Sequence, residues 1–273
     1  MFFDLHTHSV YSDGTWTPAQ IVEAAAKNDL TVALTDHNSV SGLPAFLAAA
    51  REFRVDVVPG IEFSTDYLEK ELHIVALFVP EQAYGAIREY VAAGDRRKEE
   101  SNRLLIQRLR DAGYEVDYEE IVAKTPDGRV NRAIIGEELV RKGYVPTVKA
   151  AFASVLSEKR GLYVRPKRPE ALETVRFIRR IGALPVLAHP YLSLEQEALE
   201  QFLPMAKACG LAAMETQYST YDPATTALAV ATAERFGLLQ SGGSDFHGAV
   251  KPQIALGQAG IHREAFERLK KAL

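Results

Sequence analysis

The chain opens with Phe2-Phe3-Asp4-Leu5-His6-Thr7-His8-Ser9, an apolar run that ends in two histidines two positions apart. On a β-strand, residues two apart point to the same face, so the side chains of His6 and His8 can share one ion. The polar residues that follow, up to Gly14, favour the end of a strand over a pair of core histidines. Neutral imidazoles are common ligands of divalent metals. This stretch therefore predicts a strand with metal ligands at its C-terminal end.

Nearly all of the other ligand-type side chains fall at the ends of further apolar runs. They lie in Thr35-Asp36-His37-Asn38, at Glu62, at His73, in Ala188-His189-Pro190 and in Gly243-Ser244-Asp245-Phe246-His247. The set is larger than one tetrahedral ion requires. We therefore predict a polynuclear hydrolytic centre.

Some of these residues are interpreted as ligands only in the company of the others. Glu62 ends the almost wholly apolar run Val57–Ile61, where a carboxylate is costly unless cations surround it, and we expect it to bridge two ions. His73 on its own fits a core histidine with a satisfied hydrogen bond, and it becomes a ligand candidate because the neighbouring strands need a partner. His37 is expected to bind an ion while Asp36 orients a neighbouring group.

Seven apolar or β-branched runs alternate with helix-like stretches along most of the chain. The predicted strands are Phe2–His6, Thr31–Thr35, Val55–Phe63, Leu72–Phe78, Leu184–Ala188, Leu211–Thr216 and Leu238–Ser241. Thr17-Pro18 and Asp222-Pro223 are typical starts of the helices between them. This alternation is typical of a parallel sheet, and ligands at the ends of so many strands favour a closed barrel. An open doubly wound sheet would concentrate its site at one switch point, and no glycine-rich phosphate loop supports it.

Residues 84–165 interrupt this alternation. The segment is helical in its pattern and rich in charge, and none of the repeated strand-like runs falls in it. We interpret it as a helical insertion between the fourth and fifth strands and expect it to cover the mouth of the barrel. The predicted architecture is thus an α/β barrel formed by residues 1–83 and 166–273, with an insertion subdomain at 84–165.

Composition limits the class of protein further. With 273 residues, of which 47% are hydrophobic, the chain can bury a large core. The net charge of −4 excludes an overall basic surface for nucleic acid, and a single cysteine excludes an internal disulfide and zinc-finger motifs. Neither a leader-like start nor an apolar run long enough to span a bilayer is apparent. We therefore expect a cytoplasmic protein without a membrane partner.

Taken together, the motifs resemble those of the PHP family, named for polymerase and histidinol phosphatase. The matching stretches are Asp4–Ser9, Ser12–Gly14, Thr35–His37, Gly60–Glu62, Leu72–Ile74, Ala188–Pro190 and Gly243–His247. The resemblance covers nearly the whole chain. It implies a distorted seven-stranded (β/α)7 barrel with two or three divalent metal ions, manganese most often and otherwise iron or zinc.

The resemblance also implies how the ligands divide among the ions. The first ion would be held by His6, His8, Glu62 and Asp245, the second by Glu62, His73 and His189, and the third by His37, His247 and Asp13. Several members of the family have a histidine near the position of Asp13. The aspartate would therefore weaken the third site or change its preference for a metal.

Within the family, the insertion is similar to that of the nucleoside 3′,5′-bisphosphate phosphatases, whose relatives also trim short RNA from the 5′ end. Val130–Gly136 matches the arginine-containing start of an insertion helix, and Gly161–Val164 matches the exit from the insertion. The resemblance implies that Arg132 binds the second phosphate of the substrate, while a solvated arginine at a helix start is the other interpretation. Relatives often have a histidine where this chain has Ile134, which keeps a cyclic phosphate open as an alternative substrate.

The expected activity is hydrolysis of a phosphomonoester, the 3′-phosphate of a nucleoside 3′,5′-bisphosphate, together with trimming of short 5′-phosphorylated RNA. The ions would lower the pKa of a water and neutralise charge on the phosphoryl group, and His247, His37 and Asp36 are the candidates for protonating the leaving group. The partners would be small phosphorylated substrates, a nucleotide or short RNA, without a stably bound nucleic acid. The alternatives are another PHP hydrolase, such as a cyclic-phosphate phosphodiesterase or a histidinol phosphatase-like enzyme, and a non-catalytic PHP module.

Overall fold

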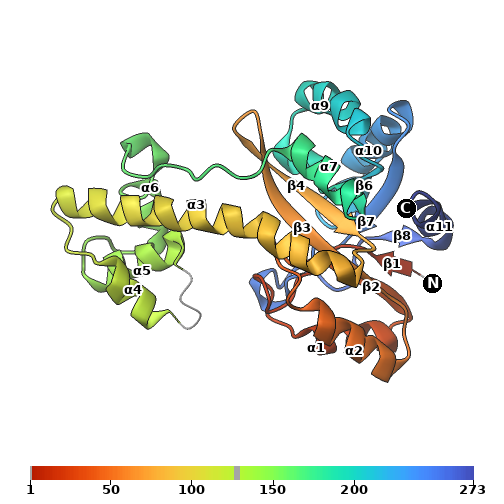
Figure 1. Cartoon of the computed structure of the whole chain (residues 1–273), viewed down its shortest axis with the longest axis horizontal. Helices are drawn as coiled ribbons and strands as arrows, with labels where there is room; N and C mark the ends of the chain where they lie inside the picture. Colours follow the sequence, from red (N-terminus) through yellow and green to blue (C-terminus); the bar gives the residue numbers. More distant parts are fainter. Residues whose placement is uncertain (1, 126–129) are drawn as a thin grey trace. The chain divides into compact units, whose positions relative to one another are not determined.

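The computed structural model of the chain describes residues 2–125 and 130–273, apart from the side chain of Asp95 (Figure 1). The chain divides into two compact units. The first unit consists of Met1–Val91 and Arg168–Leu273, and the second consists of Ala92–Lys167. Residues 126–129 of the predicted insertion lie outside the described part.

The first unit is built on an eight-stranded sheet. Its strands are β1 (Phe2–Asp4), β2 (Leu30–Leu34), β3 (Val57–Tyr67), β4 (Lys70–Leu77), β5 (Leu184–Leu187), β6 (Ala213–Tyr218), β7 (Leu239–Gly243) and β8 (Ile261–His262). In space they follow the order β7-β6-β5-β4-β3-β2-β1-β8. Each of the seven predicted runs overlaps one of the strands β1 to β7. The eighth is a two-residue strand antiparallel to β1, which the sequence did not predict.

The two edges of this sheet meet and make it a nearly closed barrel. After β1 the main chain pairs with the end of β7, where the N–H of Leu5 donates to the carbonyl of Gly242 at 3.1 Å. Further along, the N–H of His8 donates to the carbonyl of Phe246 at 2.9 Å. Glycine permits this approach, because a Cβ on Gly243 would lie 2.5 Å from the backbone nitrogen of His6. The predicted fold class, a distorted (β/α)7 barrel, is confirmed.

One strand departs from the expected parallel arrangement. β4 is antiparallel to both of its neighbours, β3 and β5. It follows β3 directly through a hairpin in which Leu68 and Glu69 have φ angles of 47° and 64°. A two-residue loop in the left-handed region joins antiparallel neighbours, whereas a parallel pair needs a crossover of about a dozen residues or more. The expectation of a wholly parallel sheet is therefore wrong at β4, and Glu62 lies within β3 and not at its end.

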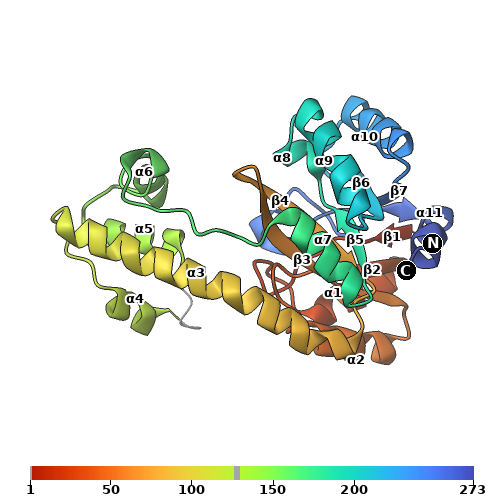
Figure 2. The ribbon, with the colours of Figure 1, turned by 45° about the horizontal axis from the view of Figure 1, so that its top comes forward.

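Helices surround the sheet of the first unit (Figure 2). They are α1 (Pro18–Lys27), α2 (Leu43–Phe53), α7 (Ala171–Arg180), α8 (Pro190–Ser193), α9 (Gln196–Ala208), α10 (Pro223–Arg235) and α11 (Arg263–Lys271), with short 3-10 turns η1 (Glu81–Ala83) and η3 (Gly248–Val250). The predicted starts of α1 and α10 are confirmed, since Thr17 and Asp222 each accept a hydrogen bond from a backbone N–H of the first turn. These caps satisfy donors that a helix start leaves without an intrahelical partner.

Alternation along the strands separates two apolar layers. Val32 belongs to the layer that packs against the helices. Val58 and Ala213 belong to a second cluster, formed by the opposite faces of the strands. Glu62 lies four positions after Val58, and Glu215 lies two positions after Ala213, so both carboxylates continue this inward face toward the rim.

The second unit is helical among its described residues. α3 (Tyr84–Asp111) begins in the first unit and continues into the second, followed by α4 (Tyr118–Lys124), α5 (Arg132–Arg141), α6 (Val148–Ala153) and the turn η2 (Glu158–Arg160). The unit has its own apolar core, which includes Leu105, Ile135 and Leu139. That the insertion covers the mouth of the barrel stays a prediction. Among residues 2–125 and 130–273 we find no helix with the length and apolar character that a bilayer-spanning segment requires.

Candidate metal centre

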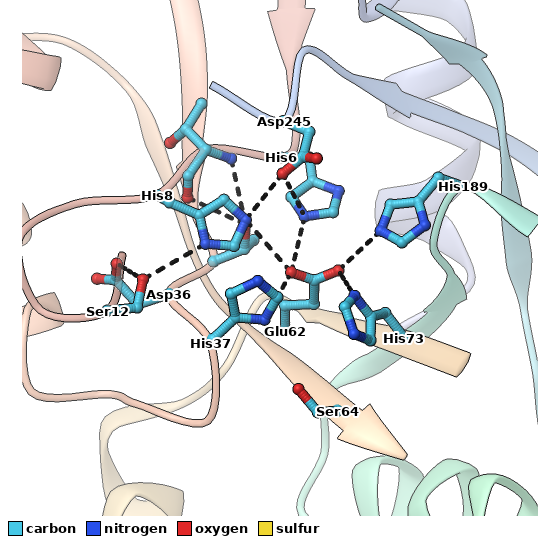
Figure 3. Close-up of polar contacts among 12 residues, drawn as sticks. His6, His8, Ser12, Asp36, His37, Glu62, Ser64, His73, His189 and Asp245 are labelled. Atoms are coloured by element: carbon cyan, nitrogen blue, oxygen red, sulfur yellow. Dashed lines mark hydrogen bonds and ion pairs between the residues drawn. The ribbon is translucent and has the colours of Figure 1, made fainter. Parts of the chain in front are cut away.

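The side chain of Glu62 lies at the centre of a group of histidines (Figure 3). Each of five imidazoles has a ring nitrogen between 2.8 and 3.2 Å from one of the two carboxylate oxygens. The five are His6, His8, His37, His73 and His189. Three of the rings face Oε2 and two face Oε1. A carboxylate that faces a separate set of imidazoles on each oxygen has the arrangement of a bridge between two cations.

The strand arrangement explains why these side chains meet. His37 follows β2, and it forms an isolated parallel bridge with Glu62 of β3. His73 lies on β4 opposite Ser64 of β3. Because β4 is antiparallel, its first half reaches the rim at which the parallel strands end, so a histidine near its start joins histidines that follow other strands. His189 follows β5 at the same rim.

Asp245 completes a group with His6, His8 and Glu62. Its Oδ1 lies 3.1 Å from Nε2 of His8 and 3.6 Å from Nε2 of His6. The potential ligand atoms of the four residues lie within 4.8 Å of one another, and all four side chains are buried. This is the set that the resemblance implied for the first ion.

A second group lies around Glu62, with His73 and His37 as potential ligands. His189, which the resemblance assigns to this ion, faces the same oxygen as His73, with its Nε2 3.1 Å from Oε1. His37, which the resemblance assigns to the third ion, has its Nδ1 3.1 Å from Oε2. The structure therefore places His37 between the second and third sets.

The third group consists of His8, Asp13, His37 and His247. Oδ1 of Asp13 lies 3.3 Å from Nε2 of His247, and its Oδ2 lies 3.8 Å from Nε2 of His37. The Asp13 side chain is 54% exposed, unlike the buried Glu62 and Asp245. Of the three groups, this one is the most open to solvent.

Crowding of charge shifts the pKa values of the group. Burial disfavours the charged rings of His8 and His73, but neighbouring carboxylates outweigh burial and raise their pKa values to about 9 and about 10. Burial alone would raise the pKa of Glu62, yet His37, His6 and His73 hold it well below its usual range. At His37 burial outweighs the attraction of Glu62 and lowers the pKa to about 3. Without a cation, the carboxylates are thus balanced by protons on some of the rings.

Several buried atoms of the group form no well-directed hydrogen bond, although carboxylate oxygens lie close to most of the nitrogens. They are Nε2 of His6, Nε2 of His8, Nδ1 of His37, Nδ1 of His73, Nδ1 of His189 and Oε2 of Glu62. A buried polar atom without a partner is costly, and several such atoms together need a common explanation. Imidazole nitrogens and carboxylate oxygens are ligands of divalent manganese, iron and zinc. The residues present therefore fit a centre of more than one divalent cation.

Asp36 lies behind the ligands. Its Oδ1 accepts hydrogen bonds from the Ser9 N–H and the Ser12 hydroxyl, each at 2.7 Å, and its Oδ2 accepts one from the Ser9 hydroxyl at 2.8 Å. These bonds hold the loop between His8 and Asp13. They favour the orienting role considered for Asp36 over the role of a proton donor.

Glu215 is a functional candidate that the sequence analysis missed. Its Oε1 lies 2.8 Å from Nδ1 of His6, and its Oε2 accepts a hydrogen bond from the backbone N–H of His189 at 2.7 Å. The side chain is buried. The signal was available, because Glu215 ends the apolar run Leu211–Met214 just as Glu62 ends its own.

Two further groups support Asp245 from behind. The hydroxyl of Tyr218 and the ammonium of Lys251 both donate to its Oδ2, each at 2.7 Å. Oδ1 is thereby directed toward His6 and His8. No pattern in the sequence points to either residue, since both contacts depend on how the chain folds at the rim.

In the second unit, Arg132 is the first residue of α5. Its guanidinium carbon lies 3.9 Å from the ring centre of Tyr163 and 5.3 Å from that of Phe152. Asn131 caps the helix by accepting a hydrogen bond from the N–H of Ile134 at 3.0 Å. Stacking holds a guanidinium in one plane, which suits bidentate binding of a phosphate. The role of Arg132 as the group that binds the second phosphate stays a prediction.

The chain is similar to proteins of known family. The model of the PHP domain matches residues 4–163. The 5'-3' exoribonuclease Rnm of Salmonella typhimurium is 30% identical over 266 residues, which cover 94% of this chain and 89% of that protein. The phosphoribosyl 1,2-cyclic phosphate 1,2-diphosphodiesterase of Eggerthella lenta is 32% identical and covers 91% and 95%, respectively. The 3',5'-nucleoside bisphosphate phosphatase of Chromobacterium violaceum is 29% identical and covers 89% and 86%.

A solved structure supports the same relationship. It comes from Bifidobacterium adolescentis, and its description proposes a metal-dependent phosphoesterase. It aligns with a TM-score of 0.77 and 26% identity, over 99% of this chain and 96% of that one. The likeness therefore extends over both units of the chain.

Proposed function

The chain belongs to the PHP domain family and is a metal-dependent phosphoesterase, and we propose that it removes the 3′-phosphate of nucleoside 3′,5′-bisphosphates. We also propose that the same centre trims short 5′-phosphorylated RNA. Two relatives support this substrate class, since one is named as a 3',5'-nucleoside bisphosphate phosphatase and another as a 5'-3' exoribonuclease.

The observation that carries the proposal is the set of five imidazoles on the two oxygens of Glu62. Divalent ions held there would supply an activated water and neutralise charge on the transferring phosphoryl group. Glu62 would be shared between the first two ions, with His6, His8 and Asp245 on one side and His73 and His189 on the other. His37, His247 and Asp13 would hold a third.

The leaving oxygen needs a proton donor at the rim. His37 is 24% exposed, but its lowered pKa keeps the ring neutral at neutral pH. Nδ1 of His247 lies 2.8 Å from the carbonyl oxygen of Asp245, which fixes the proton on that nitrogen and turns Nε2 toward Asp13. We favour His247, paired with Asp13, as the group that exchanges a proton with the leaving oxygen when no third ion occupies the site that these residues would form.

The second phosphate of the substrate distinguishes a bisphosphate from a nucleoside monophosphate. Arg132 is the residue we propose for it, because its stacked guanidinium can donate two parallel hydrogen bonds to phosphate oxygens. Hydrogen bonds to charged groups contribute about 1.5–3 kcal/mol, which corresponds to roughly 10- to 100-fold in binding. A bisphosphate should therefore be preferred over AMP by about that factor.

A substrate panel tests the proposal. Protein loaded with Mn²⁺ is assayed for phosphate release from adenosine 3′,5′-bisphosphate, from AMP and from a short 5′-phosphorylated RNA. The expected result is a kcat/KM for the bisphosphate at least about 10-fold above that for AMP. The Glu62→Gln variant, purified in parallel, controls for contaminating phosphatases. Equal rates on the bisphosphate and on AMP, or no release from either, would contradict the proposed substrate.

A cyclic phosphate is the second candidate substrate. One observation favours it, the 32% identity with a phosphoribosyl cyclic phosphate diesterase over 91% of this chain. A ribose 1,2-cyclic phosphate therefore belongs in the panel. Faster hydrolysis of this compound than of the bisphosphate would replace the first proposal by the second.

We propose manganese as the native metal and the cytoplasm as the compartment. The ligand set contains nitrogen and oxygen atoms and no thiolate, a composition that suits manganese, iron and zinc. Metal analysis of protein purified without chelator tests the first point. Two or three equivalents dominated by zinc or iron would replace manganese.

A further inference from the structure

Strand β6 carries none of the predicted metal ligands, yet two of its side chains contact them. Glu215 reaches His6 and the backbone of His189, and Tyr218 reaches Asp245. The two residues are three positions apart. On a regular strand, residues three apart point to opposite faces of the sheet. Both side chains nevertheless contact the metal centre.

A β-bulge accounts for this. Against β7, Glu215 pairs with Ser241, but Gln217 pairs with the next residue, Gly242. One extra residue, Thr216, is therefore inserted on the β6 side. A bulge shifts the alternation by one position and re-aims the side chains that follow. Ala213 and Glu215 face inward before the bulge, and Tyr218 faces inward after it.

The carboxylate of Glu215 meets two donors at once. Oε1 lies 2.8 Å from Nδ1 of His6, and Oε2 accepts the backbone N–H of His189 at 2.7 Å. The side chain is 1% exposed, so water does not substitute for either bond. When Nδ1 of His6 carries the proton, its Nε2 presents a lone pair to the point shared with Glu62 and Asp245.

The second bond supports an unusual backbone. His189 has φ 27° and ψ 55°, in the region that non-glycine residues rarely adopt. This conformation turns the imidazole toward Oε1 of Glu62 immediately before α8. Backbone strain of this kind costs on the order of 1–3 kcal/mol and persists only where surrounding contacts hold it. The bond to Glu215 is one such contact.

We propose that Glu215 is a positioning residue of the metal centre, which through one carboxylate fixes the tautomer of His6 and the backbone of His189. Glu215 thus links a ligand of the first ion to a ligand of the second. Partners of metal-bound histidines fix ring orientation, and their loss weakens metal affinity by about 10- to 100-fold. This inference rests on the proposed metal centre but not on the choice of substrate.

Glu215→Gln is the sharpest test, because glutamine has the same shape but only one acceptor oxygen. If that oxygen accepts the fixed N–H of His189, the amide NH2 faces Nδ1 of His6. The proton of His6 then moves to Nε2, the atom that must bind the ion. We expect Mn²⁺ affinity to fall by about 10- to 100-fold at the site held by His6 and His8, and occupancy to fall by one ion at limiting metal.

Three readouts separate positioning from general damage to the strand. Metal affinity is measured by calorimetric titration, and the thermal unfolding of metal-free protein is measured beside it. The metal-free unfolding temperature of Glu215→Gln should stay within a few degrees of wild type. In zinc-loaded protein, ¹⁵N NMR of the imidazoles should show a proton on Nδ1 of His6 in wild type and on Nε2 in the variant.

Gln217→Ala on the same strand is the matched control. Gln217 follows the bulge. Within the described residues, its side chain forms no hydrogen bond or ion pair with the metal ligands. Its metal affinity should equal that of wild type. An equal loss of affinity in both variants, or full affinity in Glu215→Gln, overturns the proposal.

Tyr218→Phe provides a graded comparison. It removes one of two donors to Oδ2 of Asp245 while Lys251 retains the other. The loss of metal affinity should therefore be smaller than in Glu215→Gln. A larger loss of metal affinity in Tyr218→Phe than in Glu215→Gln would contradict the proposal that Glu215 is the main positioning residue on this strand.

The outcomes also separate this inference from the proposed function. If wild type binds metal, Glu215→Gln loses it and no substrate of the panel is hydrolysed, the substrate proposal fails and the role of Glu215 stands. If wild type hydrolyses the bisphosphate and Glu215→Gln keeps its full metal content, the substrate proposal stands and the proposed role of Glu215 fails. Wild-type protein that binds no divalent metal overturns both.

Discussion

The rim of the barrel and the helical unit differ in which groups neutralise their carboxylates. At the rim, Glu62 and Asp245 are buried. Glu62 faces only imidazoles, whereas Asp245 faces His6 and His8 and also accepts hydrogen bonds from Tyr218 and Lys251. In the helical unit, Arg103 pairs with Glu99 and Glu119 on side chains that are about half exposed or more. The apolar residues there form a separate core beneath such pairs.

Glu138 sharpens the contrast, because it is a buried carboxylate of the helical unit. It is 6% exposed and is met by Arg141 and Lys124. Hydrogen bonds from Arg141 are the main cause that lowers its pKa to about 2. The chain itself supplies cations for Glu138, whereas Glu62 has only imidazoles, whose charge depends on pH. The site around Glu62 therefore needs external cations, and Glu138 does not.

The largest expected effect is on the rim. Glu62→Gln removes the negative charge that both oxygens present to five imidazoles. We expect kcat/KM to fall by about 10³-fold or more, the scale of loss for a major electrostatic stabiliser of a transition state. Steady-state phosphate release measures this. Glu52→Gln on the exposed surface of α2 is the control and should keep wild-type activity. A similar loss in both would show that Glu62 has no special role.

Removal of the metal should separate the two units. At a free metal concentration of about 1,000 times Kd, binding stabilises the folded barrel by about 4 kcal/mol. For a unit of this size that corresponds to roughly 8–16 °C in unfolding temperature. Hydrogen exchange with and without chelator should show lost protection in the barrel strands and unchanged protection in α4 and α5. Equal losses in both units would contradict the comparison.

The pH dependence of metal binding follows from the raised pKa values of His8 and His73, about 9 and about 10 in the absence of metal. Both rings are protonated at neutral pH and must lose the proton to bind an ion. Affinity should therefore rise with pH up to about 9, by as much as ~100-fold per pH unit if both protons are displaced. Calorimetry in buffers of different ionisation enthalpy measures the release.

The same pKa values imply an opposite trend for the metal-free barrel. A raised pKa in the folded state contributes stability that is fully present below the ordinary histidine value of 6.5 and is lost as the pH rises through about 9 and 10. The unfolding temperature of chelated protein should fall between neutral and alkaline pH. For the metal-binding trend, an affinity that stays constant between neutral pH and about pH 9 would show that protons do not compete with the ions.

The smallest expected effect concerns the helical unit. Arg132→Ala should raise KM for a bisphosphate by about 10- to 100-fold and leave a monophosphate surrogate nearly unchanged, because only one substrate has the second phosphate. Arg110→Ala is the control, since Arg110 is 61% exposed and pairs with Asp117 at the surface. An equal effect of Arg132→Ala on both substrates would assign Arg132 to packing against Tyr163.

Much of the candidate site could be predicted from the sequence because most of the ligands follow or end an apolar run. His6, His37 and His189 all lie where a predicted strand stops, so a barrel brings them to one rim. Glu62 was identified because a buried carboxylate in an apolar run is energetically unfavourable without nearby cations. The same argument, applied to Glu215, would have identified that residue too. A buried carboxylate leaves a local signal, since the residues around it are apolar.

Other features leave no local signal. The direction of β4 depends on the two-residue hairpin at Leu68 and Glu69, which contains none of the usual turn residues. The contact of Tyr218 with Asp245 depends on a bulge that breaks the alternation of β6. Bulges are set by how two strands pair, so periodicity along one strand cannot reveal them.

The amino-acid sequence by itself determined which side chains have the chemistry of metal ligands and at which strand ends most of them lie. Burial and alternation are visible in short stretches of the sequence, without knowledge of the fold. Only the tertiary structure decided that Glu62 meets five rings at once, that His37 lies between two sets of ligands and that Glu215 stands behind His6 and His189. Closure of the sheet brings residues from both ends of the chain within hydrogen-bond distance, and the distances among them depend on register, strand direction and one inserted residue.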